Sequence, residues 1–165
     1  MRYLKPLSLF QDLLESNAKK RGRLLGLDVG ERYVGLAVSD RQNRIASPLS
    51  VILRKKTNIP IIADDFQTLI SEQSLAGFVF GCPFDRQWSA SSALQIKIFI
   101  DELCKTNKLE GLKYTFWDER FTSKNVELLL KPITLHPIET KAVIDKLSAV
   151  SILQGYLDYV NRKLN

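Results

Sequence analysis

Between residues 23 and 53 the apolar positions gather in three short segments rather than in a helical stripe. Such segments predict strands, and they are separated by a glycine turn at 29–30 and a polar turn at 41–44. Gly35, inside the second segment, has no side chain and allows another backbone to approach closely. The three predicted strands span 23–28, Tyr33–Ser39 and Ala46–Leu53.

Beyond residue 57 the spacing changes to that of helices alternating with strands. An apolar stripe that includes Ile62 and Phe66 predicts a helix starting at 58–60, with Asn58 as its cap. Apolar runs at 76–81 and 114–117 predict two further strands. Further helices are predicted after Ser89, over about 122–130 and over about 139–160.

This order of elements predicts an α/β domain in which helices cover a mixed sheet of five strands. No internal repeat, low-complexity segment or linker divides it. We therefore expect one domain over 23–165, preceded by a basic extension over 1–22. Leu7, Phe10 and Leu13 in this extension have near-helical spacing, which predicts a helix packed on the domain.

The formal net charge of +6 is concentrated at the start of the chain. Residues 1–23 carry six basic and two acidic side chains, so the rest of the chain is only weakly basic. The extension therefore has the charge to assist binding to phosphates, or it is a solvated segment. Its acidic residues, Asp12 and Glu15, argue against a targeting peptide, although import into an organelle stays open.

Composition excludes several classes of protein. No apolar run approaches the roughly 20 residues that span a bilayer, so no membrane association is expected. Cys82 and Cys104 fit no zinc spacing and are too few for a disulfide framework. This cysteine usage favours a reducing compartment, and we expect the cytoplasm.

Carboxylates stand where buried strands are predicted to end. Asp28 follows a run of apolar residues at the carboxyl end of the first strand, where open α/β sheets usually bind ligands. Asp118 and Glu119 end the last predicted strand in the same way. Because strand side chains alternate between faces, only one of this pair is expected to share a site with Asp28. The sequence does not choose between the two.

Asp145 interrupts the apolar face of the last predicted helix. It shares a stripe with Ser148, Ala149 and Ile152, and the small residues let the helix press closely on the sheet. A carboxylate buried there is costly unless it meets a partner or a metal ion.

The predicted catalytic residues are therefore Asp28, Asp118, Glu119 and Asp145. Their oxygen atoms suit Mg²⁺ or Mn²⁺, and the chain has no thiolate–imidazole set for zinc. We take Asp28, Glu119 and Asp145 as the working metal ligands, with Asp118 as the alternative to Glu119. Such a site can activate water for displacement at a phosphodiester. His136, the only histidine, lies in a predicted loop and is interpreted as a surface residue.

The same order of segments resembles the YqgF/RuvX family of ribonuclease H-like proteins, relatives of the Holliday-junction resolvase RuvC. The resemblance covers about residues 24–160. It is carried by GLDVGERYVGLAVSD at 26–40, FGCP at 80–83, DERFTSKNVE at 118–127 and VIDKLSAVSILQGYLD at 143–158.

The resemblance implies a ribonuclease H-like fold whose acidic site matches Asp28, the Asp118–Glu119 pair and Asp145. It also implies a role in maturing the ribosomal RNA precursor of the small subunit. Together with the carboxylate site this predicts a magnesium-dependent nuclease, and we expect a monomer or homodimer. RNA is then the favoured substrate, and structured DNA, cut as by a resolvase, is the alternative. The predicted nucleic-acid contacts are Arg32, Arg86, Arg120 and Lys124.

Two features depart from the family pattern. One is the extension before the first strand. The other is the loop after FGCP, which is bulkier than usual and in which Trp88 beside Arg86 either stacks on a base or covers a helix start.

Two other classes of function stay open at this point. The chain could be a binding module that keeps the fold without turnover, since fold does not determine function. Sugar kinases and actin-like ATPases also begin with an acidic strand end followed by a glycine turn. They need two such domains, however, and 165 residues supply one.

Overall fold

A six-stranded mixed sheet forms the centre of the molecule, with the strand order β1-β6-β5-β2-β3-β4. The computed structural model describes residues 1–16, 21–83, 91–118 and 137–164. β3 pairs antiparallel with β2 and β4, whereas β5 runs parallel to β2 and β6. The strands are β1 (Arg2–Tyr3), β2 (Arg23–Val29), β3 (Tyr33–Ser39), β4 (Ala46–Leu53), β5 (Leu75–Cys82) and β6 (Lys113–Asp118).

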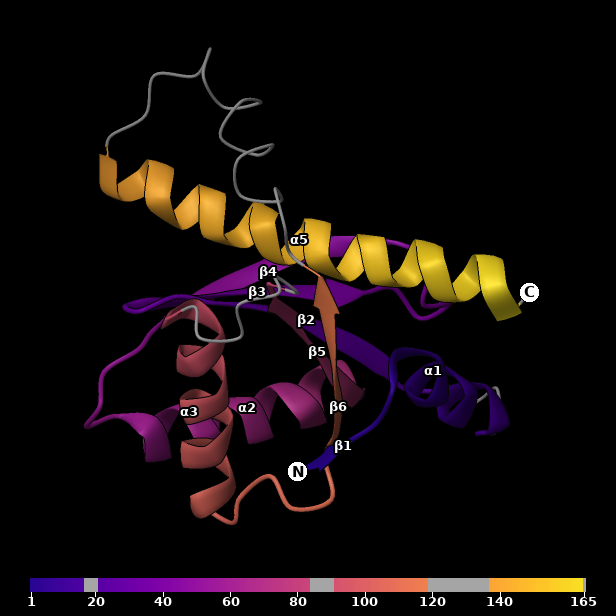
Figure 1. Ribbon diagram of the computed structural model, residues 1–165, viewed down its shortest axis with the longest axis horizontal. Coiled ribbons are helices and arrows are strands. Elements are labelled where there is room, and N and C mark those ends of the chain that lie inside the picture. Colours follow the sequence, from indigo (N-terminus) through magenta and orange to yellow (C-terminus); the bar gives the residue numbers. More distant parts are fainter. Residues whose placement is uncertain (17–20, 84–90, 119–136, 165) are drawn as a thin grey trace.

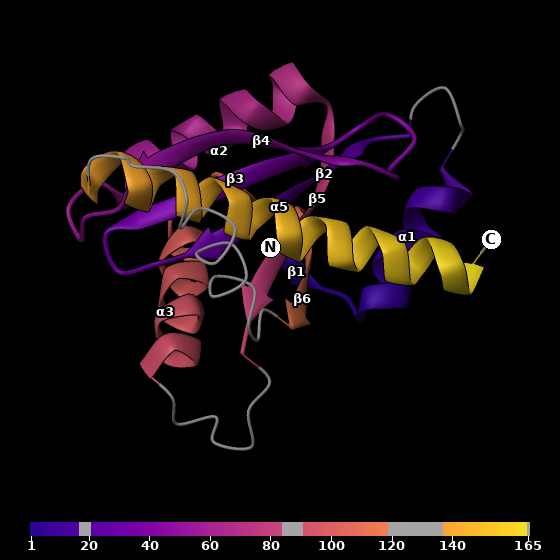
Figure 2. The ribbon, with the colours of Figure 1, turned by 90° about the horizontal axis from the view of Figure 1, so that it is seen from above.

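Helices cover both faces of this sheet. Figure 1 shows α5 along one face, with α2 and α3 on the other. In Figure 2 the C-terminal end of α5 lies beside α1, and the two helices are in contact. Within the described segments, no helix combines the length and apolar character needed to cross a bilayer. The described helices are α1 (Pro6–Glu15), α2 (Ile59–Gln73), α3 (Ser91–Lys105) and α5 (Pro137–Leu164).

The core has two layers because strand side chains alternate between the faces of the sheet. One layer packs between the sheet and α2 and α3, and it includes Leu25, Leu27, Leu36, Phe78 and Phe80. The other packs between the sheet, α1 and α5, and it includes Leu24, Ala37, Val79, Leu153 and Tyr156.

The sheet has one strand more than predicted. β1 is two residues long, too short to give a periodic signal, and it pairs parallel with β6 through Arg2↔Lys113 and Tyr3↔Tyr114. β3 and β4 have the predicted bounds, and β2, β5 and β6 extend their predicted strands by one or two residues. The mixed sheet flanked by helices confirms the predicted fold class.

Asn58 immediately precedes α2, as predicted, but its side chain does not cap the helix. Its Oδ1 accepts a hydrogen bond from the Lys55 amide at 2.7 Å, and its Nδ2 donates to the Leu53 carbonyl at 2.9 Å. The side chain therefore closes the turn between β4 and α2 and is not available to the helix. The predicted helix start at Ser89 and the predicted helix at 122–130 lie outside the described residues.

The basic extension contains the predicted helix, α1, which buries Leu9, Phe10 and Leu13 against α5 and the sheet. The Tyr156 hydroxyl, on α5, donates a hydrogen bond to the Pro6 carbonyl at 2.7 Å. Burial raises the pKa of Tyr156, so this hydroxyl keeps the proton that it donates. The division into 1–22 and 23–165 stays a prediction.

Candidate active site

Helix α5 touches the sheet most closely at Gly35 of β3. A Cβ atom on Gly35 would lie 2.1 Å from the carbonyl oxygen of Asp145 and 2.5 Å from its carbonyl carbon. No side chain fits there, so the glycine that the sequence marks as permissive is where the helix backbone rests on the strand. This contact places Asp145 directly over β3.

Asp28 lies on the same face, beside that contact. It is the antiparallel pairing partner of Gly35, which puts their Cα atoms about 5 Å apart. Two residues earlier on β2, a Cβ on Gly26 would meet Leu153 of α5, so Gly26 faces this helix. By alternation, the side chain of Asp28 faces α5 as well. The structure therefore places Asp28 and Asp145 on the same side of the sheet, both next to Gly35.

The carboxylate of Asp145 is almost completely buried, with 4% of the residue exposed. Its Oδ1 accepts a hydrogen bond from Lys141 Nζ at 2.9 Å, an ion pair one helical turn apart. Its Oδ2 is buried and has no hydrogen-bond partner among the residues that the structure describes. Ser148, Ala149 and Ile152 are buried along the same stripe, as predicted.

Lys141 was not among the predicted site residues, although its i, i+4 spacing to Asp145 could have identified it. Its side chain is 59% exposed, against 6% for the side chain of Asp145. An ion pair this open to water contributes at most about 1 kcal/mol. One exposed ammonium therefore leaves half of the buried carboxylate without a partner.

Asp118 belongs to the opposite face of the sheet. It pairs with Cys82 of β5, which is buried in the layer beneath α2 and α3. The preceding residue, Trp117, packs on the α5 side against Tyr156 and Tyr159. Asp118 thus lies at the same end of the sheet as Asp28, but its side chain is on the opposite face.

The remaining acidic candidate, Glu119, lies outside the described residues. Among the residues that the structure does describe, no group of three or more His, Cys, Asp or Glu side chains could hold a metal ion. The described part of the site is therefore a pair of carboxylates, Asp28 and Asp145.

Arg54 supports the turn that follows Asp28, a role that the sequence did not reveal. Its Nη1 donates to the Gly30 carbonyl at 3.0 Å, and its guanidinium lies 4.9 Å from the centre of the Phe99 ring on α3. Burial lowers the pKa of Arg54, while the carboxylates of Glu102 and Glu31 raise it. Arg54 is half-buried because it ties this turn to α3.

Of the predicted nucleic-acid contacts, only Arg32 is described, and it is exposed in the turn between β2 and β3. Its carbonyl accepts a hydrogen bond from the Arg54 amide at 2.7 Å, so the turn is held to the end of β4. The other predicted contacts and two further candidates lie outside the described residues: Arg86, Arg120, Lys124, Trp88 and His136.

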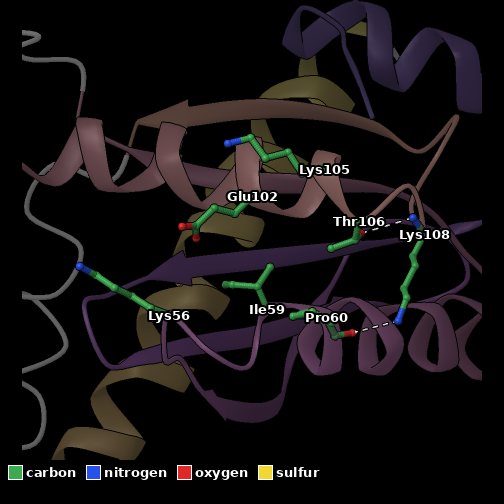
Figure 3. Close-up of a pocket in the computed structure, with 7 residues that line it drawn as sticks. All are labelled: Lys56, Ile59, Pro60, Glu102, Lys105, Thr106 and Lys108. Carbon is green, nitrogen blue, oxygen red and sulfur yellow. Dashed lines mark hydrogen bonds between the residues drawn. The ribbon is translucent and has the colours of Figure 1, made fainter.

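A cavity of about 390 Å³ opens between the start of α2 and the end of α3. Figure 3 shows its lining, which includes Ile59, Glu102 and three lysines, Lys56, Lys105 and Lys108. It lies on the α2–α3 side of the sheet, whereas Asp28 and Asp145 meet on the α5 side. This cavity is therefore separate from the carboxylate site.

Comparison with known proteins gives a match over most of the chain. The sequence profile of the RuvX family, described as Holliday junction resolvase, matches residues 22–159. A protein of Caldicellulosiruptor saccharolyticus, named as a candidate pre-16S rRNA nuclease, is 34% identical over 84% of this chain and 99% of its own length. A protein of Rhodobacter capsulatus with the same name is 36% identical over 83% of this chain and 84% of its own length.

Solved structures with the same fold are more distant in sequence. RuvC of Thermus thermophilus superposes with a TM-score of 0.52 at 12% identity, covering 84% of this chain and 96% of that protein. The yeast mitochondrial Holliday junction resolvase Ydc2 gives 0.50 at 10% identity, covering 94% of this chain and 85% of Ydc2. These likenesses show the fold alone.

Proposed function

Because the chain belongs to the RuvX family, we propose that it is a metal-dependent nuclease that hydrolyses RNA phosphodiesters in the precursor of the small-subunit ribosomal RNA. The family match covers residues 22–159, which include both carboxylates of the site. The curated relatives named as candidate pre-16S rRNA nucleases support the substrate.

One observation carries the proposal: the buried and half-satisfied carboxylate of Asp145 beside Asp28. A buried acceptor without a partner costs about 1–3 kcal/mol, and more when it is charged. A purely structural ion pair would satisfy both oxygens, but Lys141 reaches only Oδ1. The free Oδ2 is an acceptor suited to a cation held between the helix and the sheet.

The donor set fits a hard divalent cation, Mg²⁺ or Mn²⁺, since it offers oxygen atoms in a partly buried setting. Asp28 and Asp145 would hold the ion, and it would supply an activated water and neutralise charge on the phosphate. For the third ligand we propose Glu119 rather than Asp118. The alternation that puts Asp118 on the opposite face favours the next residue for the face of Asp28.

The other residues of this site would position the substrate. We propose that Arg32, Arg86, Arg120 and Lys124 neutralise backbone phosphates, which supplies affinity without reading sequence. Arg54 would hold the turn that carries Arg32 and the end of β2. We further propose that the protein acts in the cytoplasm, as a monomer or homodimer.

Cleavage of branched DNA is the second candidate, because the description of the matching family is Holliday junction resolvase. An assay in magnesium buffer should compare a pre-16S RNA fragment, a linear DNA duplex and a four-way DNA junction. We expect cleavage of the RNA. Cleavage of the junction alone would show that the substrate is branched DNA and not RNA. If no substrate is cleaved, the protein is better explained as a binding module without nuclease activity.

A further inference from the structure

A second, positively charged site lies at the far end of α5 from the carboxylates. A polar cavity of about 420 Å³ opens between α1, the β3–β4 turn and the end of α5. Three arginines line it, Arg21, Arg41 and Arg44, together with Gln42 and Asn161. We call this cavity the arginine pocket. Figure 2 shows the C-terminal end of α5 beside α1, where the pocket lies.

The pocket carries positive charge that the described protein does not neutralise. No acidic residue lines it, and within the described residues none of the three guanidinium groups takes part in an ion pair. Nε of Arg21 is buried and has no hydrogen-bond acceptor in the described part of the chain. A buried cationic donor without an acceptor is costly, so an anion bound here would supply what the protein lacks.

The β3–β4 turn that presents Arg41 and Arg44 is held in place by Asn43. Asn43 is completely buried, with a positive φ of 53°. Its Nδ2 donates to the Gly22 carbonyl at 2.9 Å, and its own carbonyl accepts from Asn161 Nδ2 at 2.8 Å. The backbone that carries the two exposed arginines is therefore fixed, so less conformational entropy is lost when their side chains bind a ligand.

Much of the pocket comes from outside the part of the chain that matches the family. Phe10, Leu14 and Arg21 precede the match at 22–159, and Asn161 follows it. Phe10 is buried against the α5 layer, so α1 forms a fixed wall of the pocket. The basic extension thus contributes to a binding site and is not simply a solvated tail.

We propose that the arginine pocket binds a backbone phosphate of the nucleic-acid substrate, away from the cleavage site. Guanidinium groups bind phosphate through paired hydrogen bonds, a geometry that the three arginines can offer. Along α5, the rise of 1.5 Å per residue puts Asn161 about 24 Å from Asp145. At the 3.4 Å per base pair of B-form DNA, this corresponds to about seven base pairs, and it corresponds to somewhat more in A-form RNA, whose base pairs are more closely spaced. The identity of the substrate, though not the anion site, rests on the proposed function.

The test compares two double variants with the same change in charge. Arg41→Gln with Arg44→Gln alters the arginine pocket, and both side chains are exposed, so the fold should be retained. Lys56→Gln with Lys105→Gln alters the cavity on the opposite face of the sheet (Figure 3). Binding to RNA hairpins with stems of about four and about twelve base pairs is measured in EDTA, so that no cleavage occurs.

For the longer stem we expect the arginine double variant to bind about tenfold more weakly. Its slope of log affinity against log salt should become shallower by about 0.7–0.9, because one phosphate is no longer neutralised. Binding to the short stem should change less than twofold. The lysine double variant should behave as the parent does on both stems.

Equal losses in the two double variants would overturn the proposal, since they would show a general effect of charge. A second arm uses inorganic phosphate as the probe. If phosphate raises the melting temperature of the parent but not of the arginine variant, while RNA affinity is unchanged, the ligand is a small phosphate compound and the proposal is wrong. If the arginine double variant loses RNA affinity as expected but the parent cleaves no substrate with magnesium, the proposed nuclease function is wrong and the proposed phosphate site is retained.

Discussion

The two ends of α5 have opposite chemistry and are built in opposite ways. At Asp145 the helix backbone rests on Gly35, and the Asp145 carboxylate is buried on the same side of the sheet as Asp28. At Asn161 the helix borders an open pocket lined by arginines. The first end depends on contacts between backbones and lies within the family match, whereas the second depends largely on side chains and on residues outside it. The difference teaches that the proposed active site is built into the fold, whereas the proposed phosphate site depends on side chains from segments at the margins of the family match.

The largest effect is expected at the acidic end. Asp28→Asn keeps the volume but removes a proposed metal ligand, so cleavage in magnesium should fall by about a thousandfold or more. Affinity for RNA in EDTA and its salt dependence should be unchanged, because the arginine pocket is intact. Asp65→Asn, an exposed carboxylate on α2, is the matched control. Activity of Asp28→Asn within about threefold of the parent would remove Asp28 from the site.

A second prediction tests the claim that backbone packing builds the acidic end. Gly35→Ala places a methyl group against the Asp145 carbonyl, and this overpacking should cost about 2–3 kcal/mol. For a chain of this size the melting temperature should fall by about 5–10 °C. Gly111→Ala has a positive φ but no neighbour within 4 Å, so it should cost only about 1 kcal/mol. Equal losses in the two variants would mean that α5 can move away from β3 at little cost.

The third prediction separates a cation site from a structural ion pair at Asp145. Asp145→Asn removes a buried negative charge on the same side of the sheet as Asp28 and loses an ion pair whose lysine is exposed. The melting temperature of the metal-free protein should therefore rise by about 2–4 °C. Magnesium should stabilise the parent by mass action and the variant less. A destabilised variant with the parent's magnesium response would show that Asp145 is only the partner of Lys141.

The smallest effect concerns Lys141 itself. Lys141→Gln should lower the melting temperature without metal by no more than about 2–4 °C, because an exposed pair contributes little. The dissociation constant for magnesium, measured by calorimetry, should fall a few-fold, since the ammonium group no longer competes for the carboxylate. Lys146→Gln, on the same helix, should change neither quantity. A weaker response to magnesium in Lys141→Gln would instead mean that the lysine helps to assemble the site.

The acidic end could be predicted because each of its residues breaks a local pattern. Asp28 ends an apolar run, Gly35 interrupts another, and Asp145 stands on an apolar helix face. Strand alternation also predicted that one member of the 118–119 pair would be excluded, but choosing which one required the register of β6 with β5.

The arginine pocket could not be predicted, because its residues come from four separate segments. Arg21, Arg41 and Asn161 look like ordinary surface residues until α1, the β3–β4 turn and α5 are placed together. The distribution of charged residues along the sequence did identify a basic N-terminal extension. Deletion of residues 1–22 would remove this charge, but it would also uncover the apolar surface beneath Leu9, Phe10 and Leu13. Point substitutions in the pocket are therefore the cleaner experiment.

The position of β1 at one edge of the sheet has a consequence for how the chain is made. β1 and α1 leave the ribosome early, but their partners, β6 and α5, are synthesised more than one hundred residues later. Contacts so distant in sequence form late in folding. Until α5 appears, the apolar side of α1 stays exposed to chaperones and proteases. A chain that stops before residue 137 would therefore expose the apolar side of its first helix. Chaperones and proteases could then recognise the truncated protein at its N-terminus, although the missing segment is at its C-terminus.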